Sequence, residues 1–121
     1  MSIEKLKAVP GMDVEQGVRN CMDDNDLYVS ILEMYITQLK DNIPQLSDQL
    51  AAGDATEYGK TCHSIKGASA SVGAVAIQSA SAELEAAGKN GDSATVSAKH
   101  EEFISLLQTA VNDLSTASSW S

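Results

Sequence analysis

Apolar side chains recur along most of the chain at alternating spacings of three and four residues, which places them on one face of an α-helix. The longest such series follows the acidic stretch 23–26 and ends before Gly53, and further series follow it. The positions of the series are Leu32, Ile36, Leu39, Ile43, Leu46 and Leu50; Tyr58, Cys62, Ile65, Ser69 and Val72; Ile77, Ala80, Leu84 and Ala87; and Val96, His100, Phe103, Leu107, Ala110 and Leu114. The pattern predicts four long amphipathic helices.

Residues that start and stop helices separate these series from one another. Asp54 and Asp92 can each cap a helix N-terminus, whereas Gly73 and the turn Asn90-Gly91 each end a helix. Pro44 removes one backbone donor from the first long helix, so we expect either a kinked helix or two nearly coaxial pieces. The predicted helices span about 26–52, 54–72, 75–88 and 93–116. Long helices joined by short turns predict an all-α fold, an antiparallel up-and-down four-helix bundle.

The two ends of the chain contribute less to the predicted bundle. Residues 1–12 are expected to be a lead-in segment, after which Asp13 caps a short extra N-terminal helix that ends near Met22. This helix should lie across one end of the bundle. Its inner face would consist of Val14, Val18 and Cys21 or Met22. Residues 116–121 are expected to fray, and the packing of Trp120 stays open.

Composition narrows the class of protein further. Residues 1–121 make up one domain with enough length for a core, and the low aromatic content of 4% favours helices packed through aliphatic side chains. The formal net charge of −9 argues against a nucleic-acid partner, whose phosphates would be repelled. No apolar run approaches the roughly 18 residues of a membrane span, and the N-terminus lacks the apolar region of a signal peptide. Cys21 and Cys62 are therefore expected to be reduced thiols in a cytoplasmic monomer.

One histidine of the second predicted helix lies outside its apolar series. At about 100° per residue, His63 points roughly 140° away from the middle of that series, so its ring should stand in water. Lys66 shares its face, and the small residues Gly59, Gly67 and Ala70 would form a low platform around the imidazole. Glycine inside an exposed helix costs about 1 kcal/mol relative to alanine. Either close backbone packing or access of another protein to the ring would explain the glycine at position 67.

The segment His63-Ser64-Ile65-Lys66-Gly67, followed by Ser71-Val72-Gly73-Ala74 and Glu83-Leu84-Glu85, resembles the histidine-containing phosphotransfer (Hpt) domain. The resemblance covers about residues 9–115 and includes the helix opening Asp26-Leu27-Tyr28. It implies a phosphoryl carrier of a two-component phosphorelay rather than an enzyme, with no cofactor of its own. It also implies partners, namely response-regulator receiver domains and a hybrid sensor histidine kinase. A receiver domain would supply Mg²⁺ and most of the catalysis.

The resemblance implies that His63 attacks a receiver's phospho-aspartate in line, holds the phosphoryl group as a phosphoramidate and passes it to a second aspartate. Glu85 lies about as far beyond the hairpin at Gly73 as His63 lies before it. The Glu85 carboxylate could therefore accept a hydrogen bond from Nδ1–H of His63 and leave Nε2 as the nucleophile. Lys66, one turn away, can reach a phosphoryl group on the ring. The alternative for Glu85 is a solvated surface charge, and the alternative for Lys66 is a pair with a surface carboxylate.

Other interpretations differ in the role they give to His63. A helical module that docks onto a response regulator and regulates it by occupancy would not require phosphorylation of His63. A metal-binding bundle of the di-iron type needs inward-facing Glu and Glu-x-x-His pairs, but the apolar series are aliphatic, so no metal site is expected. His100 lies within the last apolar series, and we interpret it as a partly buried histidine with satisfied hydrogen bonds.

Overall fold

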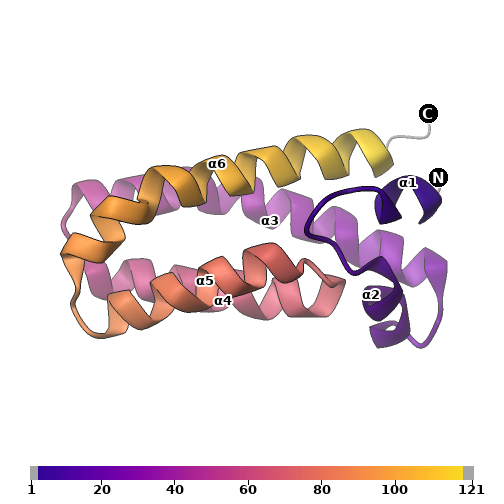
Figure 1. The fold of residues 1–121 in the computed structure, drawn as a ribbon, viewed down its shortest axis with the longest axis horizontal. Helices are drawn as coiled ribbons and strands as arrows, with labels where there is room; N and C mark the ends of the chain where they lie inside the picture. Colours follow the sequence, from indigo (N-terminus) through magenta and orange to yellow (C-terminus); the bar gives the residue numbers. More distant parts are fainter. Residues whose placement is uncertain (1–2, 119–121) are drawn as a thin grey trace.

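Six helices and no strand occur between residues 3 and 118, which is the part of the chain that the computed structural model describes. The helices are α1 (Ile3–Lys7), α2 (Val14–Asn20), α3 (Asn25–Ala51), α4 (Ala55–Val72), α5 (Val75–Lys89) and α6 (Ser93–Ser118). Figure 1 shows α3, α4, α5 and α6 side by side, each running opposite to the one before it, with α1 and α2 at one end. The predicted all-α bundle of four long helices and its short helix at one end are confirmed.

Three details of the helices differ from the sequence-based expectations. Helix α3 continues through Pro44, so the alternative of two separate pieces is wrong. The lead-in segment contains α1, which packs against α6 and buries Leu6 completely. Helix α6 extends to Ser118 and Ala117 is buried, so fraying does not begin at residue 116. Trp120 lies outside the described residues.

The aliphatic series of the four long helices meet in one core. Most of the predicted positions are buried, and the partly buried ones are Ile43, Leu50, Ala80 and Ala110. Cys21 and Met22, which follow the end of α2, were the two candidates for the last position of its inner face. Cys21 is buried and Met22 is exposed. Both Cys21 and Cys62 are free and buried, as expected for reduced thiols in the core. The core therefore fixes the rotation of each helix about its axis and leaves α4 with one outward face.

The hairpin between α4 and α5 is fixed at Gly73, which ends α4 in the left-handed conformation with φ 78°. The backbone N–H of Asp13 donates to the Gly73 carbonyl at 2.6 Å. A second link comes from α2, because the Asn20 amide lies 3.3 Å from the carbonyl oxygens of both Ala70 and Ser71. These contacts fix the C-terminal end of α4 against α2 and the segment before it, and the tight turn at Gly73 determines which side chains of α4 and α5 face each other.

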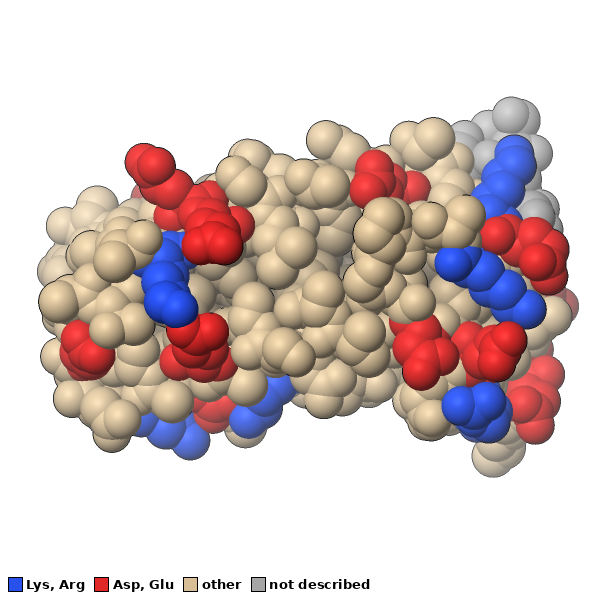
Figure 2. Space-filling view, viewed as in Figure 1, with Lys and Arg blue, Asp and Glu red and all other residues tan. Residues whose placement is uncertain are grey.

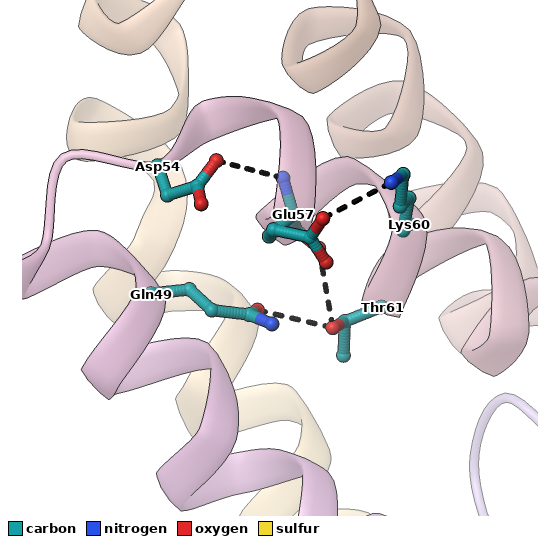
Figure 3. Close-up of polar contacts among 5 residues, drawn as sticks. All are labelled: Gln49, Asp54, Glu57, Lys60 and Thr61. Atoms are coloured by element: carbon teal, nitrogen blue, oxygen red, sulfur yellow. Dashed lines mark hydrogen bonds and ion pairs between the residues drawn. The ribbon is translucent and has the colours of Figure 1, made fainter.

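The other end of α4 is fixed by polar contacts that Figure 3 shows. The Asp54 carboxylate caps the helix by accepting from the backbone N–H of Glu57 at 3.1 Å, as the sequence predicts. The reciprocal half of this capping pattern is missing, because the Asp54 N–H donates to the Gln49 carbonyl and the Glu57 side chain pairs with Lys60 at 3.0 Å. The Thr61 hydroxyl donates to the Gln49 side chain at 3.0 Å and so ties α4 to α3.

Charged side chains are unevenly distributed over the surface. On the face in Figure 2, acidic and basic residues gather toward the two ends of the molecule, and the middle is largely uncharged. Lys7 of α1 pairs with Glu15 of α2 at 4.0 Å, and Lys99 of α6 pairs with Glu83 of α5. None of the described helices combines the length and the apolar character that crossing a membrane requires.

Candidate functional site

His63 lies in the middle of α4 on the face opposite the core. Its side chain is 66% exposed, whereas Tyr58, Cys62 and Ile65 of the same helix are completely buried. The predicted outward orientation of the ring is therefore confirmed. Among the described residues, Nδ1 has one hydrogen-bond partner and Nε2 has none, so Nε2 is open to solvent.

The partner of Nδ1 is Glu85, which α5 contributes from across the hairpin. The distance from Nδ1 to Oε2 of Glu85 is 2.8 Å, so the contact predicted from the hairpin register is formed. The Glu85 side chain is only 5% exposed, which excludes the alternative of a solvated surface charge. A buried carboxylate is costly unless cations or hydrogen-bond donors surround it, so its partners are part of the site.

Two lysines supply the remaining partners of this carboxylate. Nζ of Lys66 lies 2.5 Å from Oε1 of Glu85, and Nζ of Lys89, one turn further along α5, lies 3.0 Å from Oε2. The nearby ammonium of Lys66 lowers the pKa of Glu85 to about 2, helped by Lys89 and His63 and opposed by burial. Sequence analysis missed Lys89, although its spacing of four residues from Glu85 is the spacing of ion pairs on a helix.

The ionised carboxylate determines the chemistry of the ring. Because Oε2 of Glu85 can only accept, Nδ1 of His63 must carry the proton of the hydrogen bond. The neutral ring then presents the lone pair of Nε2 to solvent, which is the form of a nucleophile. When the ring is neutral, the two lysines and the single carboxylate give the site a net charge of +1. The site is thus locally positive, although the whole chain has a net charge of −9. The site suits an approaching anion.

The small residues expected to surround His63 take different positions. A Cβ atom added at Gly67 would meet no atom within 4 Å, so the helix surface beside the ring is open there. Ala70 is partly buried. Gly59 is buried against α5, where an added Cβ would lie 3.2 Å from Cα of Gly88, so its prediction as part of an exposed docking patch is wrong. The spacing within α4 gives the face of Gly59 but not the position of α5.

The second histidine has a different environment. His100 of α6 is buried, and its Nδ1 lies 2.8 Å from the hydroxyl oxygen of Tyr58. Its Nε2 lies 3.5 Å from the hydroxyl of Ser47, and burial lowers the pKa of the ring. The interpretation of His100 as a satisfied core histidine is confirmed. Within residues 3–118, no three histidine, cysteine or acidic side chains are grouped so that they could hold a metal ion.

Comparison with known proteins identifies one family. The family model of the Hpt domain matches residues 30–117. The match includes His63, Lys66, Glu85 and Lys89, and thus the whole constellation around the exposed ring. Neither the comparison with curated proteins nor the comparison with solved structures finds a significant match.

Proposed function

The chain belongs to the Hpt domain family, and we propose that His63 is the residue through which it carries a phosphoryl group. Members of this family are histidine phosphotransfer modules of two-component signalling, and they act as carriers rather than as catalysts. In the proposed reaction the chain takes the group from a phospho-aspartate of one receiver domain and passes it to another. A hybrid sensor histidine kinase is the proposed source of the phosphoryl group.

The observation that carries this proposal is the hydrogen bond between Nδ1 of His63 and the buried Glu85 carboxylate. The lone pair of Nε2 forms the new N–P bond in line with the breaking P–O bond, and the aspartate carboxylate leaves with the bonding electrons. The phosphorylated ring retains its proton on Nδ1 and becomes cationic, so the Glu85 carboxylate at 2.8 Å stabilises the product. Transfer to the next aspartate reverses these steps.

Lys66 is the proposed stabiliser of the loaded state. A phosphoryl group on the ring would bring about −1.5 to −2 charges close to the Lys66 ammonium, which would stabilise it. If Lys66 turns toward the phosphoryl oxygens, Lys89 still balances the Glu85 carboxylate at 3.0 Å. Gly67 and Ala70 provide the low surface on which a receiver domain would dock beside the ring. Mg²⁺ and the remaining catalytic groups are proposed to come from that domain.

The test uses the two histidines of the chain as a matched pair. The full chain is incubated with a receiver domain that carries a labelled phospho-aspartate, and acid-labile, alkali-stable label on the chain is measured. We expect His63→Gln to fold and to take up no label, whereas His100→Gln still takes up and passes on the label. Label retained on His63→Gln would overturn the assignment of the site. Unchanged regulation of the receiver by unlabelled His63→Gln would instead favour docking by occupancy.

A further inference from the structure

Helices α4 and α5 make a close backbone contact at two facing glycines. A Cβ atom added at Gly88 would lie 2.6 Å from the carbonyl oxygen of Ala55 and 2.7 Å from Cα of Gly59. A Cβ atom added at Gly59 would lie 3.2 Å from Cα of Gly88 and 3.3 Å from the carbonyl oxygen of Glu85. All of these neighbours are backbone atoms, so no flexible side chain can move aside to make room. Larger residues at either position would push the two helices apart.

This contact lies next to the His63–Glu85 pair on both helices. Gly59 precedes His63 by one turn of α4, and Gly88 follows Glu85 by nearly one turn of α5. Because the two helices run antiparallel, as Figure 1 shows, the glycine contact and the His63–Glu85 hydrogen bond are adjacent. The carbonyl of Glu85 is itself among the atoms nearest to Gly59. The distance between α4 and α5 at the two glycines therefore also sets the distance between the backbones of His63 and Glu85.

We propose that Gly59 and Gly88 are positioning residues, which hold α4 and α5 at the separation that allows Glu85 to bind Nδ1 of His63. This proposal rests on the proposed function of His63. Lys89 contacts Oε2 of Glu85 at 3.0 Å from within α5 and so holds the carboxylate on its own helix. The Nδ1–Oε2 bond of 2.8 Å spans the two helices and is therefore lengthened when they separate. Glycine also weakens a helix relative to alanine, so two facing glycines fit a need for close approach.

The experiment measures the ring tautomer of His63 in the full chain labelled with ¹⁵N-histidine, together with the rate of phosphoryl uptake from a phosphorylated receiver domain. In Gly88→Ala we expect the neutral ring to change from mainly Nδ1–H to mainly Nε2–H, because the tautomer follows the hydrogen bond. Phosphoryl uptake should fall roughly 10- to 100-fold, since the nucleophilic nitrogen is then protonated and misplaced. Gly59→Ala should change both quantities in the same direction but less, because its contacts of 3.2–3.3 Å need a smaller adjustment.

The matched control is Val111→Ala, which removes buried volume from α6 without touching the contact between α4 and α5. It should lower the melting temperature and leave the His63 tautomer and the uptake rate unchanged. If Gly88→Ala does not fold, Gly59→Ala decides the question. A folded variant that keeps the Nδ1–H tautomer overturns the proposal, whatever its uptake rate. The tautomer is measured without phosphorylation, so failure of this proposal is distinguishable from label retained on His63→Gln, which overturns the site itself.

Discussion

The surroundings of the two histidines differ although their nearest contacts are alike. In each ring Nδ1 lies 2.8 Å from a buried oxygen, which belongs to the Glu85 carboxylate for His63 and to the Tyr58 hydroxyl for His100. Helix α4 takes part in both contacts, because it carries His63 on its outer face and Tyr58 on its inner face. A hydrogen bond at Nδ1 is therefore common to the proposed carrier and to the core histidine.

The difference between the two sites lies in the charge on the partner and in the second nitrogen. Glu85 is ionised and has two lysines beside it, whereas the Tyr58 phenol is neutral and burial raises its pKa further above the ordinary value. Nε2 of His63 faces solvent, whereas Nε2 of His100 faces the Ser47 hydroxyl at 3.5 Å. A phosphoryl acceptor needs an accessible nitrogen and a carboxylate that stabilises a cationic ring, and only the site of His63 provides both.

The sharpest test of this comparison removes the Nδ1 partner from each ring. Glu85→Ala should slow phosphoryl uptake roughly 10- to 100-fold, because the ring loses both its orientation and its fixed tautomer. Glu85→Gln keeps an acceptor oxygen without the charge and should fall between Glu85→Ala and the unchanged chain. Lys66 and Lys89 lose their shared carboxylate after either change, so the free energy of unfolding should also fall, although both ammonium groups can reach solvent. Uptake kinetics and denaturant unfolding measure the two effects.

The matching change at the second ring is Tyr58→Phe. It should lower the free energy of unfolding by about 1–2 kcal/mol, because a buried ring nitrogen loses its partner, and it should leave phosphoryl uptake unchanged. Equal losses of uptake in Tyr58→Phe and Glu85→Ala would show that the two networks are coupled through α4. The comparison would then fail, because His100 would belong to the reactive site.

Access to the ring provides a second test, at Gly67. An added Cβ meets no atom within 4 Å at this position, so Gly67→Ala should raise the stability by about 1 kcal/mol through helix propensity. Gly67→Leu should also fold normally. Its side chain would lie beside His63, where a receiver domain approaches the ring, so most of the phosphoryl transfer should be lost. Transfer by Gly67→Ala should be intermediate. Ala98→Leu, an exposed position of α6, is the control and should transfer normally.

Two outcomes for Gly67→Leu contradict this expectation in different ways. Normal transfer by the leucine variant would mean that the glycine does not serve access to the ring. Unfolding of the variant would mean that Gly67 is a packing residue, contrary to the open space beside it. Thermal unfolding followed by circular dichroism and uptake of label distinguish the two outcomes.

Much of the fold follows from local sequence signals. The spacing of apolar residues predicts the four long helices and the outward position of His63, because the apolar series marks the face of each helix that turns toward the core. The His63–Glu85 contact is also predictable, since a short hairpin at Gly73 fixes which residues of α4 and α5 lie at the same height. Helix α1 was not predicted, because a helix of five residues is too short to show a periodic pattern of apolar residues.

The parts of the site that were missed depend on the side of α4 along which α5 runs. Gly59 and His63 share a helix face, but α5 covers the part of that face nearer to Gly59 and buries it against Gly88. The apolar series of one helix does not contain this information. For Lys66 the sequence left open a phosphoryl group or a surface carboxylate as its partner. In the unloaded state it pairs with the carboxylate of Glu85 at 2.5 Å, which is buried rather than on the surface, because a buried carboxylate requires cations.

The smallest expected effect concerns the pH dependence of the free energy of unfolding. His100 and Glu85 should lose their contributions to stability over different pH ranges. Burial lowers the pKa of His100 below its ordinary value of 6.5, so the unfolded chain binds the proton more readily than the folded chain. Its contribution to stability is therefore complete above pH 6.5 and is lost as the pH falls through the lowered folded pKa. The negative charge of Glu101 opposes this lowering of the pKa. The pKa of Glu85 is lowered from 4.5 to about 2, so its contribution is complete above pH 4.5 and is lost only as the pH falls through about 2.

The free energy of unfolding measured from about pH 7 to about pH 5 should therefore respond to His100 and not to Glu85. The unchanged chain should lose stability over this range, and His100→Gln should lose less. Glu85→Gln should lose as much as the unchanged chain, because its effect is confined to more acidic solution. Equal losses in His100→Gln and the unchanged chain would contradict the assignment, since the protons taken up on unfolding would then bind elsewhere. The buried ring would in that case respond to pH as an exposed one does, and the contrast between the two histidines would rest on access alone.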